Sequence, residues 1–202
     1  MRKLTLLITS LLCYVGVLHA EALVADGVYT LSADVNKQRG ELVAANDYDY
    51  PVLNGIDLNG YTGNSTAAKT NGQYWYVQSA GQGDNTYYLY NIAQRKYLVN
   101  EKGNVNFGDT PYVWTFVTNA GKPAYLNIKD AARTDKVWLS SGCGRTAVQR
   151  PVQWDSNNND GGALYTFDYV GNYFATPEAG KYYKIKGEGE LPWVTAKTTD
   201  GV

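Results

Sequence analysis

Two polar segments of the chain combine aromatic rings with carboxylates. The first runs from Asn46 to Gly72 and contains Tyr48, Asp49, Tyr50 and Tyr61. If this segment is extended, the alternation of Tyr and Asp places rings on one side and carboxylates on the other. A sugar site needs that combination, because a flat ring meets apolar C–H groups while carboxylate oxygens accept hydroxyls. The alternative is a surface loop whose tyrosines lie on the body of the protein.

The second segment is "VQWDSNNNDGG", in which Trp154 is followed by Asp155, three asparagines and Asp160. It is similar to a calcium loop, but counting from Asp155 puts glycine at the seventh position and Thr166 at the twelfth. An EF-hand loop requires glycine sixth and Glu twelfth, so we interpret the segment as an Asx-rich turn before a strand. Trp154 and Trp138 are predicted to face solvent and to stack on a ligand.

The first 22 residues have the pattern of an export signal. Met1 to Lys3 is basic, Leu4 to Leu18 is apolar, and Ala20 and Ala22 have the A-x-A spacing of a signal-peptidase site. The apolar run is shorter than the roughly 20 residues of a membrane span, so residues 1–22 are predicted to be a cleaved signal peptide of bacterial type. The mature protein is expected to be secreted, periplasmic or at the cell surface.

Cleavage at this site would remove the single histidine, His19, and one of the two cysteines, Cys13. Without imidazole the mature chain has no Ser-His-Asp or Cys-His pair and no histidine ligand for zinc. Cys143 is left without a disulfide partner and is interpreted as an unpaired buried thiol. Glycoside hydrolysis requires only two carboxylates, but the acids are spread over turns and no motif pairs them. We therefore predict a non-catalytic protein with no cofactor and no metal.

Composition and charge narrow the possible partners. The formal net charge is −1 and the Lys and Arg residues are scattered, which disfavours nucleic acid and anionic membrane surfaces. The chain has 18 Tyr and 5 Trp but only 4 Phe. Tyr and Trp combine a broad apolar face with a polar edge, which suits half-wet strands and surfaces that stack on polar ligands.

The strands that must position these residues are repeated along the chain. "VYTLSADVNKQRGELVA" from Val28, "YYLYNIAQRKYLV" from Tyr87 and "AYLNIKDAARTDKVWLS" from Ala124 each have the pattern of strand, charged turn and strand. After a loop, each is followed by an aromatic strand, "QYWYVQS", "YVWTFVT" or "ALYTFDYV". The three units average about 48 residues and lack sustained helical periodicity. We therefore predict an all-β threefold barrel in which each hairpin caps one end and each aromatic strand helps to seal the ring.

These units resemble the ricin-type β-trefoil, a family of carbohydrate-binding modules whose three hairpin units each end in a Gln-x-Trp motif. Gln73-Tyr74-Trp75 fits the motif, Tyr112-Val113-Trp114 keeps the Trp, and Ala163-Leu164-Tyr165 keeps an aromatic residue. The three aromatic residues at this position are expected to pack in the core. The resemblance implies a lectin-like module of a secreted bacterial protein, with a glycan or polysaccharide as partner. The repeated pattern of aromatic residues is also similar to that of trefoil modules attached to secreted glycan-degrading enzymes of gut bacteria.

One position departs from the family's pattern. Members that bind sugar carry an Asp after the Leu of the second hairpin strand, and an aromatic residue that stacks on the sugar ring. Here Val43, Val99 and Ser140 follow the corresponding leucines. We therefore expect any glycan site to use the two aromatic and acidic segments. The candidate binding residues are Tyr48, Asp49, Tyr50, Tyr61, Trp138, Trp154, Asp155 and Asp160. The alternative function is a structural or docking β-trefoil domain with no sugar site.

The end of the chain repeats the opening of a unit. Residues 23–171 are predicted to be the β-trefoil module, and residues 172–180, rich in small residues, to be a linker. Residues 181–202 then give two strands, Tyr182–Ile185 and Trp193–Ala196, without a closing aromatic strand. Since a lone hairpin is marginal in water, we expect a partial second module that leads to a downstream catalytic domain. The alternative is a C-terminal hairpin packed back on the barrel.

Overall fold

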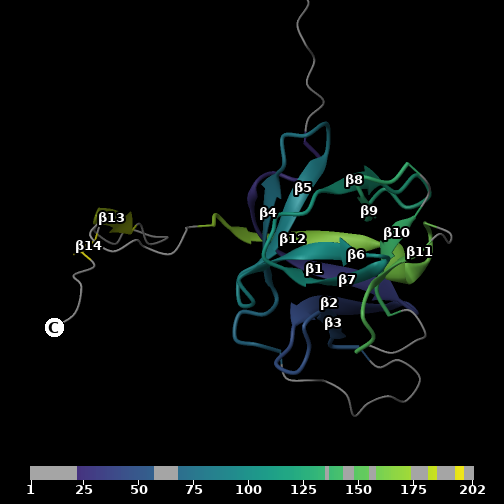
Figure 1. The fold of residues 1–202 in the computed structure, drawn as a ribbon, viewed down its shortest axis with the longest axis horizontal. Helices are drawn as coiled ribbons and strands as arrows, with labels where there is room; N and C mark the ends of the chain where they lie inside the picture. The colour runs from purple at the N-terminus through teal and green to yellow at the C-terminus, as the bar shows by residue number, and fades with distance from the viewer. Residues whose placement is uncertain are drawn as a thin grey trace, which may run out of the picture.

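The computed structural model describes residues 22–56, 68–134, 137–142, 148–154 and 158–173, together with the backbone of two further strands, β13 and β14. The twelve strands of the described barrel form three units of four (Figure 1). The first unit contains β1 (Gly27–Val35), β2 (Gln38–Ala44), β3 (Pro51–Asn54) and β4 (Tyr74–Ser79). The second contains β5 (Thr86–Asn91), β6 (Lys96–Glu101), β7 (Asn104–Gly108) and β8 (Trp114–Thr118). The third contains β9 (Leu126–Asp130), β10 (Trp138–Ser140), β11 (Val152–Trp154), the short 3-10 helix η2 (Gly161–Ala163) and β12 (Tyr165–Gly171).

Six of these strands form a closed antiparallel ring. The first and last strands of each unit follow one another in the order β1, β4, β5, β8, β9, β12 and back to β1. The second and third strands of each unit pair as three hairpins outside the ring, β2–β3, β6–β7 and β10–β11. The predicted all-β class and threefold barrel are therefore confirmed.

Each unit has one strand more than the sequence predicts. β3, β7 and β11 lie in segments that we interpreted as loops, and each pairs with the second strand of the predicted hairpin. These strands have four, five and three residues, too few for an alternating pattern to be distinguished from polar neighbours. In the first two units, pairing buries apolar residues of these strands, since Leu42 faces Leu53 and Leu98 faces Phe107.

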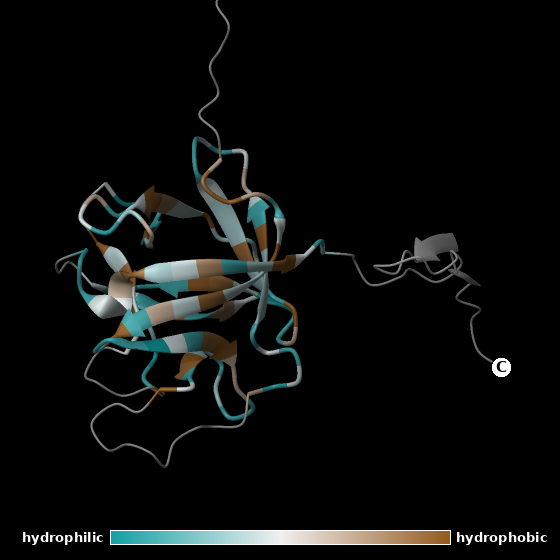
Figure 2. Ribbon diagram, turned by 180° about the vertical axis from the view of Figure 1, so that it is seen from behind, coloured by the Kyte–Doolittle hydropathy of each residue, from teal (hydrophilic) through white to brown (hydrophobic). Residues whose placement is uncertain are grey.

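Equivalent positions of the three units supply the core, and short apolar bands alternate with polar ones along the strands in Figure 2. The fully buried apolar side chains of the first two strands of each unit include Leu31, Leu42, Leu89, Leu98, Ile128 and Leu139. Trp75, Trp114 and Tyr165 are also fully buried, which confirms their predicted place in the core. The Nε1–H groups of Trp75 and Trp114 donate to the carbonyl oxygens of Leu42 and Leu98, both at 2.8 Å. Each indole thus ties the fourth strand of its unit to the second.

The C-terminal strands β13 (Tyr182–Ile185) and β14 (Val194–Lys197) form a separate antiparallel hairpin. Both lie in the segments where strands were predicted, and β14 begins one residue later than expected. The hairpin pairs with none of the described strands of the ring. The linker and the second module stay predictions, as does the signal peptide, because residues 1–21, 174–181 and 186–193 lie outside the described residues. In the part of the chain that is described, no helix is long and apolar enough to span a bilayer.

Candidate functional site

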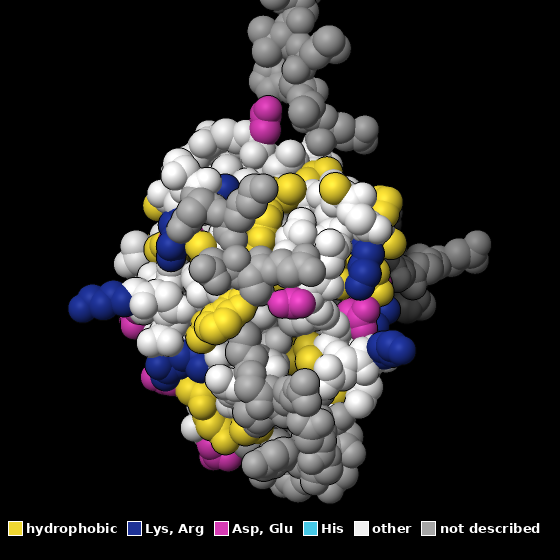
Figure 3. Space-filling model, turned by 90° about the vertical axis from the view of Figure 1, so that its right-hand side faces the viewer, with side chains coloured by type: hydrophobic (Ala, Val, Ile, Leu, Met, Phe, Trp, Pro, Cys, Tyr) yellow, Lys and Arg dark blue, Asp and Glu magenta, His cyan; other side chains and the backbone are white. Residues whose placement is uncertain are grey.

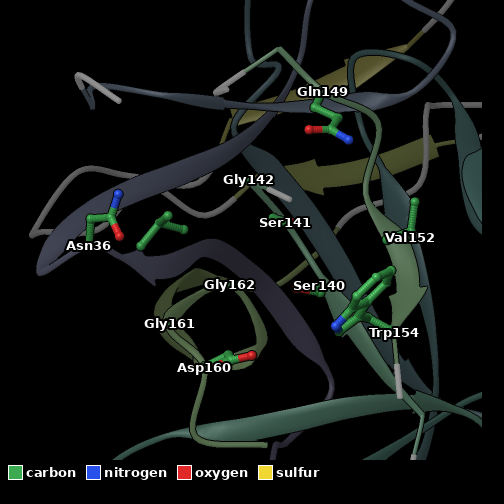
Figure 4. Close-up of a pocket in the computed structure, with 11 residues that line it drawn as sticks. Asn36, Ser140, Ser141, Gly142, Gln149, Val152, Trp154, Asp160, Gly161 and Gly162 are labelled. Carbon is green, nitrogen blue, oxygen red and sulfur yellow. The ribbon is translucent and has the colours of Figure 1, made fainter. Parts of the chain in front are cut away.

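A pocket of about 610 Å³ lies between the third unit and the β1–β2 turn. Its lining includes Asn36, Ser140, Gln149, Trp154 and Asp160. Figure 4 shows Trp154 and Asn36 on opposite sides of the pocket, with Gln149 above them and Asp160 below. Two of the predicted site residues, Trp154 and Asp160, are thus brought to one cavity.

The β10–β11 hairpin places one tryptophan at the rim and buries the other. Trp138 faces Trp154 across the hairpin. Trp154 is 53% exposed, as predicted, whereas Trp138 is only 9% exposed. The prediction that Trp138 faces solvent is therefore wrong. The reason is that β10 packs against β9, β11 and η2, so both faces of this three-residue strand are covered and all its side chains are buried.

Two glycines bring the turn that carries Asp160 close to its neighbours. A Cβ atom on Gly161 would collide with the carbonyl oxygen of Asp34, and one on Gly162 would collide with the carbonyl oxygen of Ser141. Larger residues therefore do not fit without moving the backbone. The sequence "DGG" fixes this wall of the pocket against the end of β1 and the residue after β10.

Buried asparagines hold the same turn from the inside. Asn127 Nδ2 donates to the carbonyl oxygens of Asn158 at 2.8 Å and Ala163 at 2.7 Å, and Asn119 Nδ2 donates to that of Asn158 at 2.8 Å. Both donors are fully buried, where an amide without partners would cost roughly 1–3 kcal/mol. The backbone on either side of Asp160 is therefore fixed before any ligand arrives.

The pocket lining mixes polar and apolar groups and carries little charge. Asp160 is the one ionisable group among the described lining residues, and it is exposed. Asn36, Ser140 and Gln149 supply amide and hydroxyl groups that both donate and accept. Figure 3 views the side of the molecule where Figure 1 places β10 and β11, and its acidic and basic side chains are dispersed. An uncharged ligand with many hydroxyls fits such a site better than an anion or a cation.

Tyr48, Asp49 and Tyr50 lie over the β2–β3 hairpin of the first unit. The ring centroids of Tyr48 and Tyr50 are 5.0 Å apart, and both rings pack on a small apolar cluster that includes Val43 and Val52. The Asp49 side chain is 79% exposed. The alternation therefore turns the rings toward the protein and the carboxylate toward solvent, as expected for tyrosines that lie on the body of the protein.

The Arg150 side chain lies over the ring of Tyr50 in a cation–π contact. The Arg150 guanidinium carbon lies 4.6 Å from the centroid of the Tyr50 ring, and its Nη2 is 3.4 Å from Asp49 Oδ1. Burial raises the pKa of the Tyr50 hydroxyl, Tyr48 adds to this effect and Arg150 opposes it. Of the other predicted site residues, Tyr61 and Asp155 lie outside the described residues, as does Cys143.

The three hairpins differ at the position where the ricin-type pattern has Asp. The residue after the buried leucine is Val43 beneath the tyrosines, Val99 against Gly108, and Ser140 in the pocket. A Cβ atom on Gly108 would lie 2.8 Å from Val99 Cγ1, so the second hairpin has no room for a side chain there. By register, Trp154 occupies the place that Gly108 has in the second unit. The third hairpin combines a pocket with an exposed aromatic residue, Trp154.

Sequence reasoning missed Asn36 and Gln149. Asn36 and Lys37 have left-handed backbone angles, with φ of 51° and 63°, and form the tight β1–β2 turn. An asparagine in a predicted charged turn indicates this conformation. No local pattern indicates that the turn borders the third unit, because closure of the ring brings them together.

Comparison with known proteins shows similarity in structure only. No family model matches the sequence, and no curated protein is similar to it in sequence. The Rhizoctonia solani agglutinin is 16% identical with a TM-score of 0.52, over 75% of this chain and 100% of that chain. The Macrolepiota procera ricin B-like lectin, solved in complex with lactose, is 16% identical with a TM-score of 0.55, over 73% of this chain and 99% of that one. A GlcNAcα1-4Gal releasing endo-β-galactosidase from Clostridium perfringens is 14% identical with a TM-score of 0.52, over 71% of this chain and 32% of that chain.

The fold is a β-trefoil. The structural similarity, with TM-scores of 0.52 to 0.55, shows the fold. At 14–16% sequence identity it does not show which ligand the protein binds. The resemblance to the ricin-type β-trefoil is therefore confirmed for the architecture. Within this β-trefoil, the Trp154 pocket lies on the third hairpin and the Tyr48–Tyr50 cluster lies on the first.

Proposed function

We propose that this β-trefoil is a non-catalytic, lectin-like carbohydrate-binding module and that its sugar site is the Trp154 pocket. The observation that carries the proposal is the exposed Trp154 ring beside a cavity of about 610 Å³ that amide and carboxylate side chains also line. A pyranose offers an apolar C–H face to an aromatic ring and hydroxyls to the polar groups around it. The fold shared with a lectin solved in complex with lactose supports the same proposal.

Each lining group has a role in this site. The Trp154 indole stacks on the sugar ring. The Asp160 carboxylate accepts hydroxyl hydrogens, and the amides of Asn36 and Gln149 donate and accept on the remaining sides. Ser140 stands where the ricin-type pattern has Asp, so Asp160 supplies the charged acceptor from a different part of the unit.

The lining of the pocket favours binding over hydrolysis. Glycosidases place two carboxyl groups about 5 to 9.5 Å apart across the bond that they cleave. Asp160 is the one carboxylate among the described lining residues. Among the described lining residues, a bound sugar therefore has one carboxylate as acceptor for its hydroxyls and no second carboxyl group to complete an acid and base pair.

The module is further proposed to be exported by a bacterium and to belong to a longer glycan-degrading protein. Support comes from the signal-like first 22 residues and from the separate β13–β14 hairpin. The Clostridium perfringens enzyme adds support, because the similar part makes up 32% of that chain. Mass spectrometry of the mature N-terminus and the gene sequence beyond Val202 test these two points. A mature chain that starts at Met1, or a stop codon directly after Val202, would contradict them.

A glycan array followed by titration calorimetry tests the site. Trp154→Ala is expected to weaken binding of the best array ligand about tenfold, because a stacked aromatic ring contributes about 1 to 2 kcal/mol. Trp154→Phe keeps a ring and retains most of the affinity. Tyr169→Ala removes another exposed aromatic side chain, one that does not line the pocket, and is the control. A blank array, or equal binding by Trp154→Ala, contradicts the assignment.

A structural or docking domain without a sugar site is the second candidate. It is favoured by Val43 and Val99, which occupy the ricin-type acidic position in two of the three units. In that case the array stays blank and the protein binds a separate protein domain instead.

A further inference from the structure

A row of tyrosines crosses three neighbouring strands on the outer face of the barrel. Tyr76 on β4 lies opposite Tyr90 on β5, which in turn lies opposite Tyr97 on β6. Their neighbours along the strands, such as Trp75 and Leu89, are fully buried in the core. Because side chains alternate between the two faces of a strand, Tyr76, Tyr90 and Tyr97 point away from the core. These three residues are called the tyrosine row.

Two further rings extend the row and hold it in place. Tyr173 stacks on Tyr76, with centroids 4.4 Å apart and planes 22° apart, and it lies 6.2 Å from Tyr90. Tyr90 and Tyr97 meet edge to face at 5.0 Å, and Tyr88 adjoins Tyr97 at 6.2 Å. Because the rings restrain one another, they have little rotamer freedom left to lose when a ligand binds.

The two equivalent walls of the β-trefoil show that the fold does not require these rings. In the wall of β8, β9 and β10, the residues at the same places are Thr115, Lys129 and Trp138. In the wall of β12, β1 and β2, they are Thr166, Ser32 and Glu41. Trp138 is the one aromatic residue among these six and it is buried, while the other five are not aromatic, so folding of the ring does not explain three tyrosines in one wall.

The row offers ring faces and hydroxyls with little net charge. All three side chains are half-buried, and within the described part of the chain their hydroxyls have no hydrogen-bond partner. Burial raises the pKa of Tyr76 and of Tyr90, so both hydroxyls are protonated at neutral pH. The charged groups that act on them are Asp26 at Tyr76 and Arg95 at Tyr90, one of each sign. Such a surface fits a neutral polyol better than a nucleic acid, which needs cations, or an aliphatic protein face.

We propose that the tyrosine row is a second glycan-binding surface, which holds a stretch of a neutral polysaccharide along the outer wall of β4, β5 and β6. Neighbouring strands lie about 4.8 Å apart, so three rings span about 10 Å, roughly the length of a disaccharide. None of these residues lines the Trp154 pocket. The row goes beyond the proposed function, which needs the pocket alone, and two sites in one module increase retention on a polymer through avidity.

The internal symmetry supplies test variants that the fold already accepts. Tyr76→Thr combined with Tyr90→Ser gives the row the residues found at the same places in β12 and β1. Tyr169→Thr removes an exposed tyrosine outside the row and is the matched control. Each protein is run in native gels that contain hydroxyethylcellulose, arabinoxylan, galactomannan or soluble starch, and its thermal unfolding is recorded. The double variant is expected to lose at least about fivefold in affinity for the polymer that retards the parent most, while the control matches the parent.

Trp154→Ala in the same gels separates this proposal from the proposed function. If the double variant loses retardation and Trp154→Ala keeps it, the row is supported and the pocket fails. If the double variant is retarded like the parent, the row is overturned, whatever Trp154→Ala does. A parent that none of the four polymers retards also overturns the row. Should the double variant unfold well below the parent's melting temperature, Tyr97→Glu, which copies Glu41 of the first unit, takes its place with the same expected loss.

Discussion

The first and third units contain equivalent hairpins, β2–β3 and β10–β11, but different side chains cover the two hairpins. In the first unit, Tyr48 and Tyr50 pack over Val43, and the surface of the β2–β3 hairpin is filled. In the third, Ser140 and Trp154 border a pocket of about 610 Å³ over β10–β11. Since the strand pairing is the same, the backbone does not decide between a filled and an open surface. Whether the surface is filled or open depends on the residue after the buried leucine and on the segment that crosses the hairpin.

One short segment serves both regions. Val148 packs against the same apolar cluster as the tyrosines of the first unit and Arg150 lies over one of their rings, while Gln149 and Val152 line the pocket. Residues 148–152 therefore form a wall between the filled surface and the open one. A change on one side of this wall is expected to reach the other side only weakly.

The largest difference between the first and third units is expected when Asp is introduced after the buried leucine, where the ricin-type pattern has it. Val43 is fully buried, so Val43→Asp buries an unpaired charge and is expected to lower the free energy of unfolding by about 4 kcal/mol. Ser140 is also buried but lines the pocket, so the carboxylate of Ser140→Asp has open space beside it and the expected loss is smaller, about 2 kcal/mol. Urea denaturation of both variants and the parent measures the difference. Equal losses would mean that the two surfaces are closed to the same degree.

Substitution of Gly161, which lets the turn beside the pocket pack closely against β1, is expected to have the next largest effect on stability. The Cβ atom of Gly161→Ala collides with the carbonyl oxygen of Asp34, so the free energy of unfolding falls by about 3 kcal/mol. Gly171→Ala is the matched control, because a Cβ atom there meets nothing within 4 Å. Urea denaturation again measures the change. If both glycine variants unfold alike, the turn that carries Asp160 adapts freely and the pocket is not preformed.

The smallest expected effect concerns Arg150. Its cation–π contact with Tyr50 and its exposed ion pair with Asp49 are together expected to contribute about 0.5 kcal/mol, so Arg150→Ala lowers stability by that amount and leaves glycan binding unchanged. Chemical denaturation and calorimetry measure the two quantities. Lys96→Ala removes a surface ion pair with Asp109 elsewhere on the molecule and is the control. A large loss of glycan affinity in Arg150→Ala would show that the two regions are coupled.

The effect of Arg150→Ala on the pKa of Tyr50 can also be predicted. Burial holds the pKa of the Tyr50 hydroxyl above its ordinary value of 10.0, so the neutral form stabilises the fold. That contribution is complete below pH 10 and is lost as the pH rises through the raised pKa. Because Arg150 lowers this pKa, Arg150→Ala is expected to shift it higher, as measured by NMR of tyrosine labelled at Cζ. A downward shift would mean that the guanidinium does not act on Tyr50 in solution.

Repetition made the core of this chain predictable from its sequence. Trp75, Trp114 and Tyr165 recur at one position of every unit, and a symmetric core is the part of the molecule that requires such recurrence. The pocket was predictable only in part. Trp154 and Trp138 lie in three-residue strands, and no period separates a covered strand from an open one over that length. The strand that carries Trp138, β10, packs against β9 and η2, and local sequence does not encode this packing.

The tyrosine row could not be found from the sequence for a different reason. Tyr76 and Tyr90 become neighbours only through the register of β4 and β5, and Tyr173 joins them from the end of the barrel. Composition alone indicated an excess of tyrosine. Comparison of the three symmetric walls is what shows that one wall carries three neighbouring tyrosines, where the other two have one buried tryptophan and five non-aromatic residues.

Closure of the ring also sets when the chain can fold. β1 is completed by β12, with Val28 opposite Gly171 and Ala33 opposite Tyr165, so strands from the two ends of the module must meet. A nascent chain on the ribosome lacks its last strand until synthesis of the module is nearly finished, and pairing between such distant segments is slow, on the order of milliseconds to seconds. For the export that we propose, this delay is useful, because a translocation channel threads an unfolded chain. If the protein is exported, as we propose, the barrel of its precursor therefore stays open at least until the last strand has been made.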